Sequence, residues 1–296
     1  MKEKIHFIIN SRSEKAKLIL KKQVDTTSFW NSNFDVFMWE SLYKGHALEL
    51  TQKAISDNSS TIVACGGDGT INEVARYVIE TDIPLGIVPL GSGNGLARHF
   101  KIPLHIKGAL QVIKTRNIVQ MNAGLANQNF FLCNTGVSFD THFINAYQNI
   151  PSRGFFSYFK SLKAAFTSFS VQKHTLEFDS QKRVVTPFLL MICNTNQFGY
   201  DFSLTPNASV SDGKFEMIIF NKSSYWSLFK LFLDSRFDLN LSSSFLETLL
   251  VSEVTITSES DQTLIQYDGE INHSPTNELQ VRLHPKSLGV IVPKQK

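Results

Sequence analysis

The sequence has 296 residues, of which 42% are apolar and 19% are charged, and its formal net charge is +3. This length is too great for one small domain and too short for three, so we expect one large or two medium-sized globular domains. The small positive charge gives no argument for nucleic-acid binding, and it is compatible with an anionic substrate or an acidic membrane surface.

The cysteines and the apolar runs argue against a disulfide-bonded secreted protein and against a membrane-spanning protein. Cys65, Cys133 and Cys193 each lie in an apolar stretch without metal-ligand or pairing spacing, so we expect buried free thiols in a reducing, cytoplasmic compartment. No stretch reaches the roughly 18 uncharged apolar residues of a spanning helix, and residues 1–15 lack the pattern of a signal peptide. Any contact with a membrane is therefore expected to be peripheral.

The first third of the chain alternates short apolar runs with amphipathic segments. This alternation predicts crossover units and a mostly parallel sheet covered by helices on both faces, which is a doubly wound α/β domain. The expected strands are 5–10, 34–39, 61–66 and 84–90, and the expected helices are 14–24, 45–56, 71–80, 93–99 and 107–116.

After about residue 120, strand-like runs dominate and predict an antiparallel sheet domain with helical insertions. A hairpin is expected to turn at Asn127 and Gln128. Segments 153–169 and 223–237 have helical spacing. Phenylalanine stripes such as that of 153–169 pack on a protein core more often than on lipid, so we expect the stripe to contact a core. The expected strands are 174–178, 184–194, 215–220, 253–258, 263–269, 279–283 and 289–292.

The change of pattern sets the expected domain organisation. We place the first domain at residues 1–120 and the second at residues 121–284. Periodicity alone does not decide which domain holds segment 285–296.

The stretch "CGGDGT" (65–70) follows an expected strand and precedes an expected helix near Thr70. Glycines let the backbone approach a phosphate closely, and the helix N-terminus offers free N–H groups to an anion. A carboxylate at Asp68 would repel phosphates unless a Mg²⁺ ion lay between them. The alternative is a tight turn in which Asp68 only caps the helix.

A second glycine-rich turn, "PLGSGNGLAR" (89–98), follows the next strand. Two such turns on adjacent parallel strands would form one concave anion site at the carboxyl edge of the sheet. Neither the Walker phosphate loop nor the dinucleotide fingerprint is present, because the chain has no Gly-Lys-Ser/Thr and the first strand exit has no glycine.

These two loops resemble the catalytic domain of the diacylglycerol kinase and sphingosine kinase superfamily, in its bacterial soluble branch. Three further segments are similar to that family in the same order: "NTGVSFD" (134–140), "PNASVSDGKFEM" (206–217) and "YDGE" (267–270). Five motifs in one order are far more specific than any one of them.

The resemblance implies an N-terminal doubly wound nucleotide-binding domain, a C-terminal antiparallel β-sandwich and an active site between them. It implies transfer of the ATP γ-phosphoryl group to a lipid hydroxyl with Mg²⁺. The implied nucleotide-binding residues are Asn10, Arg12, Gly66, Gly67, Gly69, Thr70, Gly91, Ser92 and Asn94; the implied catalytic residues are Asp268 as general base, Glu270 beside it and Asp68; the implied metal ligands are Asp68, Asp140 and Asp212, with backbone carbonyls of Ser209 and Lys214.

The acceptor and two rival functions stay open. Gly95 stands where many diacylglycerol kinases of this group carry aspartate, and this difference favours relatives of sphingosine kinase. The acceptor can therefore be diacylglycerol, a sphingoid base, a ceramide or another lipid alcohol. The rival enzyme is an NAD kinase or phosphofructokinase with a GGDG loop, and the rival of another class is a non-catalytic nucleotide sensor. The expected partner is a lipid at a membrane surface, not nucleic acid, and a homodimer is left open.

Overall fold

The computed structural model describes residues 2–10, 13–149, 155–197, 203–221, 246–260 and 263–294, with the backbone alone for 155–159. The chain divides into two compact units, one made of Met1–Asn122 together with Pro285–Lys296, and the other of Ala123–His284. The C-terminal segment therefore returns to the first unit.

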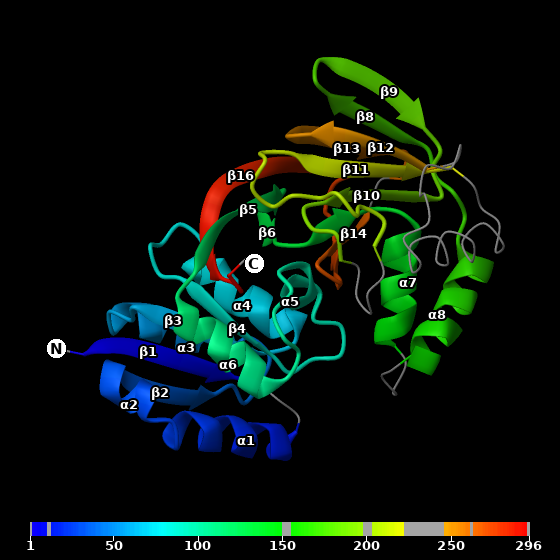
Figure 1. The fold of residues 1–296 in the computed structure, drawn as a ribbon. Coiled ribbons are helices and arrows are strands. Elements are labelled where there is room, and N and C mark those ends of the chain that lie inside the picture. The colour runs from blue at the N-terminus through cyan, green and yellow to red at the C-terminus, as the bar shows by residue number, and fades with distance from the viewer. Residues whose placement is uncertain are drawn as a thin grey trace. The chain divides into compact units, whose positions relative to one another are not determined.

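The first unit contains a parallel sheet with strand order β2-β1-β3-β4, and the end of β16 pairs with β4. β3 and β4 are buried along their whole length, as central strands covered on both faces are. The predicted α/β class is confirmed (Figure 1). The strands are β1 (Glu3–Ile9), β2 (Phe34–Glu40), β3 (Thr61–Gly66) and β4 (Leu85–Pro89), and the helices are α1 (Glu14–Asp25), α2 (Ser28–Asn33), α3 (His46–Ser56), α4 (Asp68–Val78), α5 (Gly95–His99) and α6 (Ile106–Thr115).

Helix α2 was not expected from the sequence. It has six residues, too few for a helical period, and it is held by the buried Trp30, whose ring meets Phe7 edge-on at 5.6 Å. Tertiary packing of one aromatic side chain, not a local pattern, therefore explains this helix.

The second unit is a sandwich of two sheets, which confirms the predicted β-sandwich class. One sheet is antiparallel with order β12-β11-β10-β7-β14-β15, and the other contains β16, β13, β8 and β9 together with the β5–β6 hairpin. Their facing sides form one apolar core that includes Phe131, Leu176, Ile192, Phe215 and Val281. The strands are β5 (Ile118–Ala126), β6 (Asn129–Phe131), β7 (Asn134–Gly136), β8 (His174–Phe178), β9 (Gln181–Val185), β10 (Leu189–Cys193), β11 (Phe215–Phe220), β12 (Leu246–Val251), β13 (Glu253–Ser258), β14 (Leu264–Tyr267), β15 (Glu270–His273) and β16 (Glu278–Ile291).

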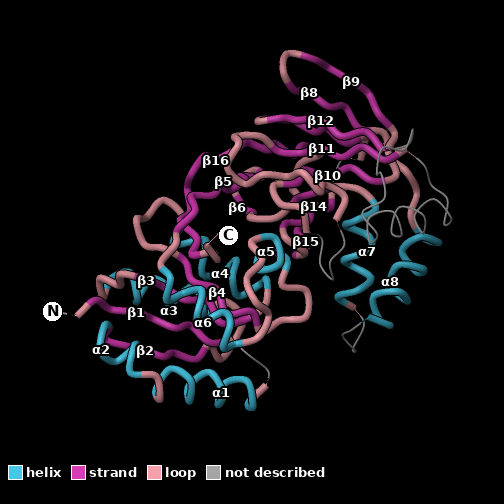
Figure 2. Tube along the Cα trace, viewed as in Figure 1, coloured by secondary structure: helices cyan, strands magenta, loops and turns pink. Residues whose placement is uncertain are grey.

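Two helices, α7 (Phe139–Gln148) and α8 (Phe155–Ser168), lie side by side in the second unit (Figure 2). The described part of the predicted aromatic stripe of α8, namely Leu162 and Phe166, packs with Phe169 against an apolar cluster around Phe188. This cluster covers the face of β10 and β11 that points away from the sandwich core. The stripe of α8 thus contributes to a core there.

Some expected elements differ from the structure. The hairpin at Asn127 is confirmed, because Ala126 pairs with Asn129. The expected strands 279–283 and 289–292 belong to one strand, β16, within which Lys286 has a left-handed φ of 46° and donates its N–H to Asn122 Oδ1. Helix α7 was not expected, and the expected helix 223–237 lies outside the described residues.

The buried His174 makes the stability of the second unit depend on pH. It is 1% exposed, its Nδ1 lies 3.0 Å from Ser258 Oγ, and burial lowers its pKa to about 4. Because the folded pKa is below the unfolded value, protonation favours the unfolded chain as the pH falls from about 6.5 toward 4. We expect this residue to cost about 2 kcal/mol of unfolding free energy between pH 7 and pH 5.

The variant His174→Asn keeps a polar atom for Ser258 but does not titrate. Urea unfolding at pH 7 and pH 5 should show a smaller acid loss in the variant than in the wild type. Equal losses in the two proteins would show that His174 does not carry this effect.

Candidate active site

The two predicted glycine loops touch each other in the first unit. β3 and β4 are parallel neighbours with Gly66 paired to Pro89, and the N–H of Leu90 donates to the Gly66 carbonyl at 2.8 Å. A Cβ atom on Gly91 would lie 2.5 Å from the Gly67 Cα, a separation that real Cβ atoms do not show. Glycine at these positions therefore lets the two backbones touch. This packing requirement explains the glycines in addition to any need for a ligand to approach the backbone.

Asp68 joins the two loops through its carboxylate. Its Oδ1 accepts a hydrogen bond of 2.7 Å from the N–H of Gly95, the first residue of α5. Burial raises the pKa of Asp68, and the backbone N–H groups of Gly95, Asn94 and Leu96 oppose that rise. The alternative interpretation made Asp68 the cap of the helix that follows it, but Asp68 is the first residue of that helix and accepts from the start of α5 in the second loop.

Helix α4 begins at Asp68, two to three residues before the start near Thr70 and Ile71 that the sequence predicted. A negative charge in the first turn is favoured by the helix dipole, and Gly67 in an extended conformation is the N-cap. The N–H groups of the first turn, which includes Gly69 and Thr70, have no acceptor within the helix. These are the groups that would meet an anion.

The other predicted nucleotide-binding residues have different local roles. Asn94 closes its own turn, because its Oδ1 accepts from the Gly91 N–H at 3.0 Å and its Nδ2 donates to the Gly91 carbonyl at 2.8 Å. Ser92 is exposed, and Asn10 directly follows β1 and donates its N–H to the Cys65 carbonyl. A side chain on Gly66 would overlap Thr70. Arg12 lies outside the described residues.

Asp268 lies in the tight turn between β14 and β15. It has a φ of 49° and Gly269 has a φ of 87°, as in a two-residue hairpin turn. Its carboxylate accepts three backbone hydrogen bonds: Oδ2 from Leu132, and Oδ1 from Cys133 and Asn134, at 2.6–2.9 Å. Asp268 therefore fixes the connection from β6 to β7, while Glu270 is half-buried at the start of β15.

Gln266 supports this turn and was not identified from the sequence. Its side chain is fully buried, its Nε2 donates to Asn134 Oδ1 at 2.8 Å, and its Oε1 accepts from the Gly269 N–H at 3.0 Å. A polar residue in the apolar strand "TLIQY" was the signal that could have found it.

The remaining predicted metal ligands belong to the second unit. Asp140 is buried in α7, where its Oδ1 accepts from the N–H and hydroxyl of Ser138, and burial raises its pKa to about 6. Asp212 is exposed and accepts from the Lys214 N–H at 3.0 Å, in the segment that includes Ser209. Within the described part of the chain, no three His, Cys, Asp or Glu side chains gather as a metal site.

A second buried acid, Glu216, was missed by the sequence analysis. It lies in β11, where all six residues are buried, and burial followed by the charge of Asp212 raises its pKa to about 7. Its Oε2 has no hydrogen-bond partner. Glu216 could have been found from the sequence, because it is the one acidic residue inside the apolar run "FEMIIF".

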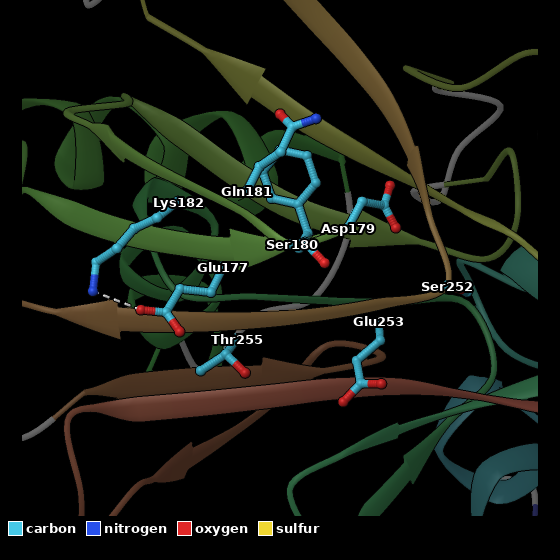
Figure 3. A pocket seen from close by; sticks show the side chains of 9 residues that line it. Glu177, Asp179, Ser180, Gln181, Lys182, Ser252, Glu253 and Thr255 are labelled. Atoms are coloured by element: carbon cyan, nitrogen blue, oxygen red, sulfur yellow. Dashed lines mark ion pairs between the residues drawn. The ribbon is translucent and has the colours of Figure 1, made fainter.

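An open pocket of the second unit contains none of the predicted site residues (Figure 3). The β8–β9 hairpin and the start of β13 line it, and Lys182 pairs with Glu177 at 2.7 Å between two exposed side chains. None of its lining residues is a buried polar group without a partner. The pocket therefore gives no sign of a ligand.

Comparison with known proteins identifies the family. The model of the "Diacylglycerol kinase catalytic domain" matches residues 4–126, and that of the "YegS C-terminal NAD kinase beta sandwich-like domain" matches residues 136–292, more than half of the chain. The chain therefore belongs to the diacylglycerol kinase superfamily, in the branch with a YegS-type β-sandwich, and it carries the catalytic domain of a kinase.

Individual relatives agree with this assignment. A protein of Chromohalobacter salexigens named "Probable lipid kinase YegS-like" is 29% identical over 75% of this chain and 72% of its own length. A "Diacylglycerol kinase" of Staphylococcus haemolyticus is 28% identical over 61% of this chain, but the match spans only 56% of that protein. A crystal structure of a diacylglycerol kinase from Bacillus anthracis covers 98% of this chain and 97% of its own with a TM-score of 0.76 at 18% identity, which shows the same fold. In the described part of the chain, no helix has the length and apolar character to cross a membrane.

The contact between the loops can be tested by adding one methyl group. Gly91→Ala should force the loops apart and lower the unfolding free energy by about 1–3 kcal/mol, with weaker ADP binding. Gly67→Ala is the matched control, because its Cβ would lie 3.2 Å from the Gly91 Cα and needs only a small shift.

Urea unfolding and calorimetric titration with ADP would measure both effects. We expect the order wild type, Gly67→Ala, Gly91→Ala for stability and affinity. A Gly91→Ala protein as stable as the wild type would show that the loops do not depend on this contact.

Proposed function

We propose that this protein is an ATP-dependent lipid kinase that transfers the γ-phosphoryl group to a lipid hydroxyl, most simply of diacylglycerol or a sphingoid-type lipid. The observation that carries the proposal is the joined pair of glycine loops in a kinase catalytic domain. The printed names of the relatives support a lipid as the acceptor class. Such an activity would belong to phospholipid metabolism.

The first unit would bind the nucleotide phosphates. The first-turn N–H groups of α4, around Gly69 and Thr70, would donate to phosphate oxygens, and the positive end of the helix dipole would favour their charge. The exposed loop at Gly91 and Ser92 would form the other wall. Phosphoryl transfer depends mainly on such positioning and on charge neutralisation.

Mg²⁺ would supply charge neutralisation when bound. Asp68 fits such an ion as an outer ligand, because its Oδ1 already accepts from Gly95 and it belongs to no group of three His, Cys, Asp or Glu side chains among the described residues. Mg²⁺ at phosphates keeps several waters, and a single carboxylate can hold one of them. Asp140, Asp212, Ser209 and Lys214 remain predicted ligands in the second unit.

Asp268 would accept the proton of the lipid hydroxyl. Backbone N–H groups of Leu132, Cys133 and Asn134 hold this carboxylate in place, and a fixed carboxylate can act as a general base. In the step, the lipid oxygen forms a bond to the γ-phosphorus, the bond from that phosphorus to the β–γ bridging oxygen breaks, and ADP leaves. Glu270, two residues on, would add negative charge that a bound cation offsets.

One observation favours a second candidate function. The model that matches residues 136–292 is described as NAD kinase-like, so phosphorylation of a dinucleotide is the alternative. A nucleotide sensor without turnover is a further alternative, which the presence of Asp68, Asp268 and Glu270 disfavours. We also propose that the protein is cytoplasmic and contacts a lipid surface peripherally. A homodimer is a separate proposal.

The lipid proposal is tested by supplying acceptors in parallel. Full-length protein with radiolabelled ATP and Mg²⁺ should label diacylglycerol, a sphingoid base or a ceramide in mixed micelles, with products identified by mass spectrometry. Labelling of NAD alone would favour the alternative, and ADP binding without transfer to any acceptor would favour the sensor.

Asp68→Asn separates the chemistry from the fold. An amide oxygen still accepts from Gly95, so the loss of charge at α5 should cost only about 0.5–1 kcal/mol, whereas kcat/KM should fall by about two orders of magnitude or more. The exposed Asp82→Asn of the same unit is the charge-matched control. Near-normal transfer by Asp68→Asn would contradict its role in organising the metal.

A further inference from the structure

The turn between β14 and β15, which carries the proposed base Asp268, has a backbone conformation that needs support from its surroundings. Asp268 and Gly269 both have positive φ angles, 49° and 87°. A Cβ atom on Gly269 would meet no atom within 4 Å, so the conformation and not a close neighbour requires glycine there. Because glycine adopts either sign of φ with similar ease, other contacts must select this conformation of the turn.

One such contact comes from inside the sheet. Gln266 of β14 is fully buried, and its Oε1 accepts a hydrogen bond of 3.0 Å from the Gly269 N–H. That N–H belongs to the peptide unit between Asp268 and Gly269. The Gln266 Nε2 donates to Asn134 Oδ1 of β7 at 2.8 Å, which fixes the orientation of the amide group. Gln266 therefore ties the turn to the neighbouring strand.

A second contact comes from helix α7. Gln148 is the last residue of this helix and is exposed, and its Nε2 donates to the Gly269 carbonyl at 3.0 Å. That carbonyl belongs to the peptide unit between Gly269 and Glu270. The two glutamines thus bond the peptide units on both sides of Gly269, one from the interior and one from the surface.

The loop that holds the Asp268 carboxylate is itself fixed. The backbone N–H groups of residues 132–134 donate to this carboxylate. Asn194 holds the loop, because its Nδ2 donates to the Leu132 carbonyl and its N–H to the Cys133 carbonyl, both at 2.8 Å. A rotation of the turn would therefore move the carboxylate relative to donors that do not follow it.

We propose that Gln266 and Gln148 are positioning residues, which hold the turn so that the Asp268 carboxylate stays aligned with the hydroxyl to be phosphorylated. The inference rests on the proposed kinase function, in which Asp268 accepts the proton of that hydroxyl. Both glutamines act through Asp268 and not by contact with the substrate. A displacement of about 1 Å at a reacting group can lower a rate by about 100-fold, so the loss of either contact should lower kcat.

Gln148 gives the sharper test, because an exposed side chain can be changed with little effect on stability. Gln148→Glu keeps the shape of the side chain but has no donor for the Gly269 carbonyl. With the acceptor lipid that the wild type uses, kcat should fall by about threefold to tenfold. KM for ATP and the thermal midpoint should not change, because the proposed nucleotide site belongs to the first unit.

Asn149→Asp is the matched control for the added charge. Asn149 is exposed at the same helix end, and its side chain donates to Asn145 within the helix and not to the turn. This variant should have the kcat of the wild type.

A second background separates positioning from a general loss of structure. Gln266→Leu, which removes the inner contact, should lower kcat by about tenfold or more and also lower the thermal midpoint. In an Asp268→Asn background, Gln148→Glu and Gln266→Leu should each lower the residual kcat by less than about twofold. A residue that acts through Asp268 has no further effect once that carboxylate is absent.

Hydrogen exchange of the turn gives a readout that does not require activity. In the peptide that spans β14 and β15, the amides of the turn should exchange at least about threefold faster in Gln148→Glu and in Gln266→Leu than in the wild type. Asn149→Asp should exchange at the wild-type rate.

The contrary results are distinct. An unchanged kcat in Gln148→Glu, an equal fall in the Asp268→Asn background, or unchanged exchange in both variants would overturn the positioning role and leave the kinase proposal standing. A wild type that phosphorylates no lipid would overturn the proposed function, and faster exchange in the variants would then still support the hold of the two glutamines on the turn.

Discussion

The proposed phosphate site depends on the contact between the backbones of Gly67 and Gly91, with the Asp68 carboxylate bonded to the N–H of Gly95. Two loops that follow neighbouring parallel strands are held there as one piece. No side chain separates them, so the first turn of α4 and the loop at Gly91 stay at a fixed separation. Any account of phosphate binding by this unit depends on that fixed geometry.

A carboxylate also accepts hydrogen bonds from the backbone of a loop in the second unit. Asp268 accepts three backbone N–H groups from the β6–β7 connection, as Asp68 accepts those at the start of α5. In both places backbone N–H groups donate to a carboxylate. The acids that the proposed chemistry needs are therefore also the groups that position the loops, so only a substitution that keeps the acceptor oxygen, such as Asp68→Asn, separates chemistry from folding. Glu216 and Asp140 differ, because each keeps an oxygen without a partner.

The sequence predicted the elements whose pattern is local. The alternation of β1 to β4 with helices, and the hairpin at Asn127, required only periodicity and turn residues. It did not predict α2, where Trp30 packs against Phe7, or the left-handed residue Lys286 within β16, whose N–H donates to the distant Asn122. The glycine loops were recognisable from spacing, but their contact with each other was not, because it depends on the register of β3 and β4. Gln266 and Glu216 were missed because a polar residue inside a strand has no periodic signature.

The central claim is that the two joined loops bind the phosphates of a nucleotide. A crystal structure of the full chain with ADP and Mg²⁺ tests it most directly. The account predicts phosphate oxygens within hydrogen-bond distance of the first-turn N–H groups of α4 and of the loop at Gly91 and Ser92, with Asp68 still bonded to Gly95. A nucleotide whose phosphates contact neither loop would contradict it.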